Sequence, residues 1–315
     1  MASAAVPAAE EATVKNRDGF RLLTGAAGLI APLALLLLVA VLAQQAWPAI
    51  TRFGWAFLVG REWDPVHIHF GALPYIYSTV VSSSLALLIA VPVGIGVAIF
   101  LAEPGQARTR GAIGIGVELL AAIPSVVYGL WALFVMGPWV FKNLETPISD
   151  RLGWIAIFAG PPRSSAMFTA GLILAVMILP TLASISRDVI RAVPGGLKEA
   201  SVALGATWWE TTWRVNLPAA RAGIIGAIVL ALGRALGETI AVTMTIGNRN
   251  QISASLFEPA YSLAAVIANE FTEATGPLHS AALVELGLIL IGVTLTVNLI
   301  ALGLLRLSGL AARPA

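Results

Sequence analysis

Long apolar runs separated by short polar segments dominate the chain. Six runs are long enough to cross a bilayer, at residues 22–43, 75–101, 112–140, 166–186, 219–247 and 281–305. A hydrocarbon core about 30 Å thick needs about 20 apolar residues in a helix. A chain that crosses lipid must also satisfy its own backbone hydrogen bonds, which a helix does. The pattern therefore predicts an all-α polytopic membrane protein with six transmembrane helices.

The residues before the first run differ from the rest of the chain. Residues 1–20 are rich in alanine and polar groups, so we expect a disordered tail followed by one transmembrane domain over residues 21–310. The first run has 22 residues from Leu22 to Ala43. The apolar region of a secretory signal peptide is usually about 7–15 residues long. We therefore interpret the first run as an uncleaved span.

The orientation follows from the lysines and arginines between the runs, because these residues concentrate in cytoplasmic loops. With the N-terminus inside, six basic residues fall outside: Arg52, Arg61, Lys142, Arg151, Arg163 and Arg249. Twelve fall inside: Lys15, Arg17, Arg21, Arg108, Arg110, Arg187, Arg191, Lys198, Arg214, Arg221, Arg306 and Arg313. This imbalance predicts that both termini, and the polar segment between the fourth and fifth runs, are cytoplasmic.

Composition excludes several classes of function. Hydrophobic residues make up 58% of the chain and charged residues 11%, far from the roughly one-quarter charged residues of soluble domains. The net charge of +2 comes without a basic tract, so nothing indicates nucleic-acid binding. The absence of cysteine excludes thiolate catalysis and cysteine metal sites. No G-x-x-x-x-G-K-[ST] motif occurs, so we expect any ATP and magnesium to be bound by another polypeptide.

The segment at about 187–218 is too structured for a slack linker. Residues 197–204 contain no helix breaker, and Gly205 stands where a left-handed helix end is expected. Thr207 and Glu210 have the spacing of a capping box. We expect Leu217-Pro218 to end this second helix and to start the fifth span. The alternative is an amphipathic loop in which this spacing is accidental.

The fifth span contains the chain's most unusual charges. Arg234 and Glu238 are four residues apart, which predicts one helix face for both. Arg234 falls roughly 22 Å into the span at 1.5 Å per residue, beyond the middle of the membrane. Ionised groups at that depth are costly and usually mark a pathway. The alternative is a structural ion pair between helices, and the two roles are compatible.

Three further polar positions are candidates for the same pathway. Glu118 and Ser125 lie on either side of Pro124, which predicts a kink in the third span. Glu285 is an acid near the outer end of the last span and a second candidate partner for Arg234. Simple packing and snorkelling explain Glu118 and Ser125 about equally well.

The outer segments carry weaker signals. Asp64, His67 and His69 lack a fourth ligand, so we interpret them as surface-loop residues rather than a metal site. An apolar stripe at Leu263, Val266 and Ile267 predicts a short outer helix, either lying on the surface or closing the outer mouth.

The polar segment resembles a known motif. Glu199-Ala200, Gly205, Val215 and Leu217-Pro218 are similar to the EAA loop of ABC-importer permease subunits, with Ser201 and Val215 as mild departures. The resemblance implies a type I ABC-importer permease fold. It also implies docking of this segment on a cytoplasmic ATPase through six residues: Lys198, Glu199, Ala200, Ser201, Leu204 and Gly205.

A second resemblance concerns the substrate. Residues 233–239, GRALGET, resemble phosphate-importer permeases, and Thr239 distinguishes them from the related sulfate and molybdate pattern. Residues 118–131 and 278–290 are similar to the PstC-type subunit. This resemblance implies phosphate transport along a pathway containing Arg234, Glu238, Thr239, Glu285, Glu118 and Ser125.

The same resemblance implies several partners in the cytoplasmic membrane. They are a PstA-type second permease forming a heterodimer, an ATPase dimer that hydrolyses ATP, and a periplasmic or lipid-anchored phosphate-binding protein. Rival interpretations are a sulfate- or molybdate-type permease and an ion-coupled secondary transporter. The latter would be expected to show internal repeats and several midplane acids, and no duplicated half is evident.

Overall fold

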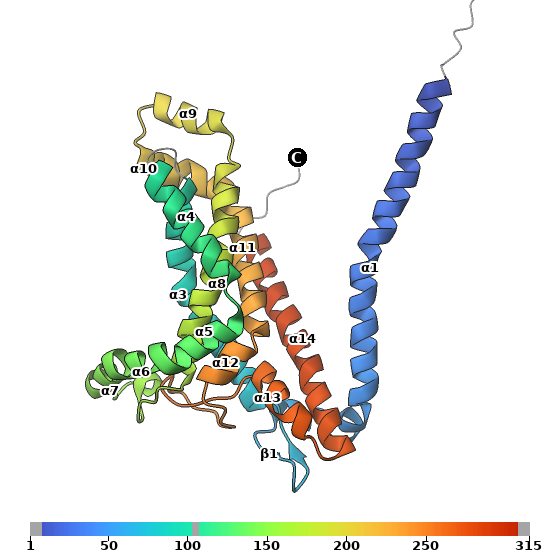
Figure 1. The fold of residues 1–315 in the computed structure, drawn as a ribbon, viewed down its shortest axis with the longest axis vertical. Helices are drawn as coiled ribbons and strands as arrows, with labels where there is room; N and C mark the ends of the chain where they lie inside the picture. Colours follow the sequence, from blue (N-terminus) through green and yellow to red (C-terminus); the bar gives the residue numbers. More distant parts are fainter. Residues whose placement is uncertain (1–7, 103–106, 308–315) are drawn as a thin grey trace, which may run out of the picture.

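The computed structural model describes residues 8–102 and 107–307 and is almost entirely helical (Figure 1). The first half contains α1 (Ala8–Phe53), α2 (Ala56–Val59), the strands β1 (Trp63–Asp64) and β2 (His69–Phe70), α3 (Leu73–Ala102), α4 (Ala107–Ala122) and α5 (Ser125–Trp131). After α5 follow η1 (Ala132–Met136), α6 (Gly137–Val140), η2 (Phe141–Glu145), α7 (Thr146–Leu152) and η3 (Ala156–Phe158).

The second half contains the long packed helices. They are α8 (Met167–Arg191), α9 (Gly195–Ala203), α10 (Trp208–Thr211), η4 (Thr212–Asn216), α11 (Leu217–Gly237), α12 (Ile240–Thr245), α13 (Leu263–Glu270), η5 (Phe271–Glu273) and α14 (Pro277–Leu307). Within the described residues, six helices are long and apolar enough to cross a membrane. The prediction of six spans is therefore confirmed, although several of their boundaries were wrong.

The core is formed by α3, α8 and α11, which pack on one another along their lengths. Alanine lines the contact, and a Cβ at Gly223 would lie 2.4 Å from Val189 Cγ1. A Cβ at Gly94 would lie 2.8 Å from Leu182 Cδ2. Small residues allow such close approach, which matters in a membrane because packing rather than the hydrophobic effect holds helices together there.

Helix α1 stands away from this core and packs against α14 (Figure 1). Its outer side chains are exposed along the apolar stretch, with Leu29 at 58% and Leu33 at 59%. The helix begins at Ala8, so most of the segment expected to be disordered is helical. It also runs on to Phe53, well past the predicted end at Ala43. Residues 1–7 lie outside the described residues.

The third predicted span, 112–140, is broken rather than kinked. The helix ends at Ala122, Pro124 is extended (φ −60°, ψ 145°), and α5 begins at Ser125. Beyond the break, α5–α7 leave the bundle at a steep angle to α4 (Figure 1). Proline has no N–H and disfavours helix in the residue before it. The carbonyl of Leu120, four residues earlier, accepts a hydrogen bond from the Tyr128 hydroxyl at 2.8 Å instead.

The fifth span also differs from its prediction at both ends. We expected a helix end at Leu217-Pro218, but α10, η4 and α11 form one continuous helix from Trp208 to Gly237. The π-helical turn directly before Pro218 changes the hydrogen-bond register where proline lacks its donor. The helix then stops at Gly237, well short of the predicted end at Gly247.

The two ends of the molecule differ in structure. The start of α1, the end of α14, and α9 with α10 lie towards the same end (Figure 1). The opposite end holds the β1–β2 hairpin, in which Trp63 pairs with Phe70, and the short helix α13. Helix α13 is not a surface helix, because Leu263, Ala264, Ala265 and Val266 are all buried.

The hydrogen bond across the Pro124 break provides a direct test. In Tyr128→Phe the Leu120 carbonyl loses its 2.8 Å bond, and the remaining contact is the Ile123 N–H at 3.4 Å. We expect a loss of about 1 kcal/mol in the free energy of unfolding, measured by thermal unfolding of the detergent-solubilised chain.

Tyr75→Phe is the matched control for this test. The Tyr75 hydroxyl is also buried, yet it has no hydrogen-bond partner in the described structure. Its removal should leave the unfolding temperature unchanged or slightly raised. Equal losses in the two variants would contradict a special role for the Tyr128 hydroxyl.

Candidate functional site

Arg234 lies in the last turn of α11, and its side chain is exposed in the isolated chain. The predicted pairing on one helix face is wrong, because the helix ends at Gly237 and Glu238 is extended (φ −70°, ψ 126°). Among the described residues, no carboxylate oxygen approaches the Arg234 guanidinium within the 4.0 Å of an ion pair. Its donors are therefore available for a ligand.

The side chains of Glu238 and Thr239 form hydrogen bonds to backbone groups at the helix break beside Arg234. Glu238 Oε1 accepts a hydrogen bond from the Ala241 N–H at 3.4 Å, at the start of α12. Thr239 Oγ1 donates to the Gly237 carbonyl at 3.3 Å. Glu238 and Thr239 thus hold the turn between α11 and α12, and both side chains are half-buried.

The two breaks are neighbours in space, because α5 packs on α12. A Cβ at Gly129 would lie 2.6 Å from Met244 Sδ and 3.1 Å from Ala241 Cα, so only glycine fits at this contact. Half-buried Ser125 opens α5 at the first break. Tyr128, one turn further on, is within electrostatic range of Arg234. The packing therefore brings the start of α5 close to the end of α11.

The other two predicted acids lie elsewhere. Glu118 is exposed on α4, and its Oε1 is 3.7 Å from Arg187 Nη1 near the α9 end of α8. Glu285 is buried in α14, and its Oε2 has no hydrogen-bond partner in the described structure. Neither acid forms an ion pair with Arg234.

This arrangement suits an anion. An arginine offers five N–H donors in a planar fork. Ionised groups within a membrane are tolerated where they face a cavity or a partner. Arg234 has no pairing carboxylate in the part of the chain that the structure describes, and it stands at the end of a helix, beside irregular backbone. In membrane proteins such backbone occurs where it is buried in protein or lines a water-filled cavity.

Two predicted features of the polar segment are confirmed, the left-handed helix end at Gly205 and the capping box. Gly205 has φ +88° at the end of α9. Thr207 and Glu210 form a capping box, with the Glu210 N–H donating to Thr207 Oγ1 at 3.3 Å and the Thr207 N–H donating to Glu210 Oε2 at 2.9 Å. Ser201 Oγ lies 2.9 Å from Thr211 Oγ1 and so ties α9 to α10.

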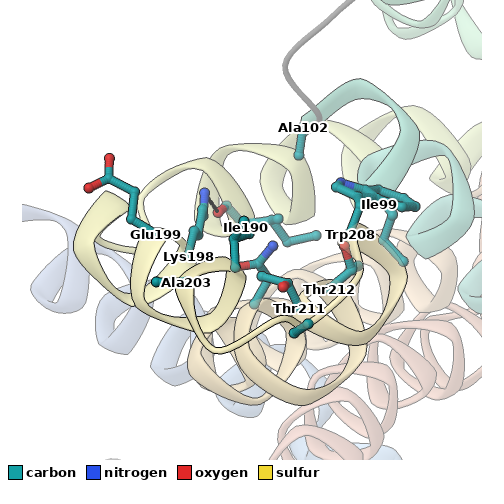
Figure 2. A pocket seen from close by; sticks show the side chains of 12 residues that line it. Ile99, Ala102, Ile190, Lys198, Glu199, Ala203, Trp208, Thr211 and Thr212 are labelled. Atoms are coloured by element: carbon teal, nitrogen blue, oxygen red, sulfur yellow. Dashed lines mark hydrogen bonds between the residues drawn. The ribbon is translucent and has the colours of Figure 1, made fainter.

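A cavity of about 630 Å³ lies beneath α9 (Figure 2). Lys198 points across it and donates to the Ile190 carbonyl at 3.5 Å, whereas the Glu199 carboxylate points away from the cavity (Figure 2). Ala200 is exposed on α9, and Leu204, which ends it, is 90% exposed. The outward surface of this segment is therefore uncovered in the isolated chain.

Two carboxyl groups, those of buried Glu145 and half-buried Glu270, have partners that the sequence does not predict. Glu145 is fully buried, and its Oε1 accepts from Thr169 at 3.3 Å. Glu270 lies 3.5 Å from His279 Nε2 at the end opposite α9. The sequence alone does not predict these pairs. The partner of Glu145 is Thr169 in α8, and the partner of Glu270 is His279 in α14, so each pair joins two separate elements.

The Asp64 and His67 pair is a loop contact. His67 Nδ1 lies 2.6 Å from Asp64 Oδ2, and this hydrogen bond lowers the pKa of Asp64. Within the described ranges, no group of three His, Cys, Asp or Glu side chains is placed to hold a metal ion.

Comparison with known proteins identifies the family. Residues 90–309 match the family described as the binding-protein-dependent transport system inner membrane component. The chain is 48% identical to the phosphate transport system permease protein PstC of Mesorhizobium japonicum, over 94% of this chain and 93% of the relative. It is 45% identical to the protein of the same name from Pasteurella multocida, over 83% of this chain and 84% of the relative.

Solved structures agree on the fold. A chain in the crystal structure of a bacterial alginate ABC transporter, in complex with an alginate pentasaccharide-bound periplasmic protein, superposes with a TM-score of 0.58. The match covers 92% of this chain and 96% of that one at 18% identity, so it bears on the fold alone. The protein has the fold of ABC-importer permeases, and it belongs to the family of inner-membrane components of binding-protein-dependent transport systems.

Proposed function

We propose that this protein is the permease subunit of an ATP-driven importer that carries inorganic phosphate into the cytoplasm. The observation that carries this proposal is the 48% identity over nearly the full length to a phosphate transport system permease protein. The chain itself is a transport subunit, and ATP with its magnesium is bound and hydrolysed by a separate ATPase.

The position of Arg234 supports an anionic substrate. Phosphate near neutral pH carries one to two negative charges, and a guanidinium matches its oxygens with paired donors. A transport site must also release its cargo, so binding must remain weak enough for the ion to leave. One arginine, with Ser125 and Thr239 near the same backbone breaks, meets both requirements. Glu285, Glu238 and Glu118 line the route or set its charge.

Exposed polar and apolar surfaces support a second permease subunit. Arg234 is exposed in the isolated chain, and an arginine facing lipid would be costly. Helix α1 leaves its apolar side chains uncovered beside the core. A heterodimer with a PstA-type permease places Arg234 at a shared pathway. A periplasmic or lipid-anchored phosphate-binding protein delivers the ion on the outer side.

The polar segment at about 187–218 couples the permease to an ATPase dimer in the cytoplasm, with both chain termini on that side. The exposed residues of α9, including Glu199 and Ala200, dock on the ATPase, and Gly205 fixes the turn. Because Trp208 to Gly237 is one helix of 30 residues, roughly 45 Å long, movement of α9 reaches Arg234 through a rigid rod. Ser201 and Thr211 join the docking helix to that rod.

The nearest rival is import of sulfate or molybdate by the same architecture. Both ions are tetrahedral oxyanions that an arginine also binds, so physical chemistry alone does not separate them. Thr239 and the names of the relatives favour phosphate. An ion-coupled transporter is disfavoured by the family to which the chain belongs.

Arg234→Gln tests the pathway. In cells that lack this protein, the variant should restore uptake of labelled phosphate at a level roughly 10- to 100-fold below wild type, because a charge-assisted hydrogen bond contributes about 1.5–3 kcal/mol. Excess sulfate or molybdate should not reduce the wild-type rate.

Arg221→Gln in the same helix is the matched control and should transport normally. Wild-type uptake by Arg234→Gln would remove the arginine from the pathway while leaving the importer assignment intact. Competition by sulfate would instead overturn the choice of substrate.

Glu199→Lys tests the coupling segment. The side chain is exposed and points away from the cavity (Figure 2), so the variant should fold and insert normally. We expect reduced phosphate uptake per ATP hydrolysed, measured for the assembled transporter in liposomes. The control Glu62→Lys reverses an exposed charge at the opposite end. A normal ratio in Glu199→Lys would contradict docking through this residue.

A further inference from the structure

The strand β1, the helix α13 and the starts of α3 and α14 lie at the end of the molecule opposite α9 (Figure 1). A pocket that contains two carboxylates lies between them. Its volume is about 460 Å³. We call it the Glu270 pocket, and the residues that determine its chemistry are Trp63, Tyr75, Asn250, Tyr261, Glu270 and His279.

Negative charge dominates this pocket. Glu270 Oε2 accepts from Trp63 Nε1 at 2.7 Å and lies 3.5 Å from His279 Nε2. Glu273, on the next turn, also lines the wall. No lysine or arginine is among the described residues that line it. Burial raises the pKa of the Tyr261 hydroxyl to about 12, and the charges of Glu270 and Glu273 act in the same direction.

Three residues in the wall have buried polar atoms without a hydrogen-bond partner in the described structure, among them His279 with both ring nitrogens. Tyr75 is fully buried and its hydroxyl has no hydrogen-bond partner in the described structure. The same holds for Asn250 Oδ1, although its amide donates to the Arg61 carbonyl at 3.2 Å. A buried polar group without a partner costs free energy. Asn250 Oδ1 accepts hydrogen bonds, and the Tyr75 hydroxyl and a neutral His279 ring each accept as well as donate, so a ligand that donates hydrogen bonds satisfies all three.

Aromatic rings complete the wall. The Trp63 and Tyr75 rings are 5.3 Å apart at 86°, and the Tyr75 and Tyr261 rings are 5.6 Å apart at 79°. Electron-rich ring faces attract cations, and guanidinium and ammonium groups are the usual ones. The carboxylates, the unpartnered acceptors and the aromatic rings therefore all favour a cation that donates hydrogen bonds.

We propose that the Glu270 pocket binds an organic cation, an alkylammonium or a guanidinium group. A bare metal ion is disfavoured, because no group of three His, Cys, Asp or Glu side chains is placed to hold one among the described residues. An anion does not fit either, because it would meet two carboxylates. The Glu270 pocket therefore prefers a cation, whereas Arg234 suits an anion. The ligand of this pocket differs from the transported ion.

A cation of this kind has two sources. One is a free amine in the external medium. The other is a lysine or arginine side chain of an extracellular protein that docks on this end of the molecule. Only the second depends on the function proposed above.

Binding of methylguanidinium to the full chain in detergent tests the pocket itself. We expect calorimetry to show saturable binding that weakens about tenfold in Glu270→Gln, since a hydrogen bond to a charged group is lost. The neutral analogue N-methylurea should not bind, and the exposed control Glu62→Gln should bind as wild type. Glutamine still accepts from Trp63, so the fold should survive, as thermal unfolding would verify.

Tyr75→Phe is a second variant that removes one unpartnered hydroxyl without removing charge, and it should weaken binding a few-fold. Methylguanidinium binding that is absent, or unchanged in both pocket variants, would overturn the proposal and leave a hydrated cavity.

A second arm identifies the source. In the assembled transporter, methylguanidinium should raise the concentration of phosphate-binding protein needed to stimulate ATP hydrolysis if the pocket receives a side chain of that protein. An unchanged titration, with binding retained in the first arm, assigns the pocket to a free amine. If the transporter does not import phosphate, only this second experiment loses its meaning, because the calorimetric measurement uses the chain alone.

Discussion

Backbone polar groups must find partners within the membrane, and this requirement governs the structure around Arg234. Two spans are interrupted, at Pro124 and at Glu238. Tyr128 satisfies the carbonyl freed at the first interruption, and Glu238 caps the helix that follows the second. Because α5 packs on α12, the two interruptions are neighbours. Irregular backbone is therefore concentrated in one region of an otherwise continuous helical core, and Arg234 lies beside it.

The continuous helix from Trp208 to Gly237 connects the proposed ATPase-docking segment to Arg234. A hinge at Pro218 would have absorbed movement of α9 before it reached the membrane. The π-helical turn before that proline instead preserves the rod. One end of the rod is capped by Thr207 and Glu210, and the last turn at the other end carries Arg234. In the proposed function, ATP-driven movement at one end alters access to the anion at the other.

Much of this structure could be predicted from sequence, because its signals are local. Apolar length gave six spans, Gly205 required a left-handed turn, and the Thr207 and Glu210 spacing gave the capping box. The consequences of proline were less predictable. Pro124 breaks its helix and Pro218 does not, since the outcome depends on which neighbouring group can replace the missing donor. Nor could the sequence place Arg234 and Glu238, because the helix stops between them at Gly237. The Glu270 pocket combines residues from four separate elements, so no local pattern marked it.

One experiment on the assembled transporter separates the roles of the two ends of the rod. The purified transporter carrying Arg234→Gln, reconstituted in liposomes with its ATPase and binding protein, should still hydrolyse ATP in response to loaded binding protein. It should accumulate almost no phosphate, because docking is intact and the anion has lost its donor. Phosphate accumulation at the wild-type rate would contradict the account, since the arginine would then be dispensable to the pathway.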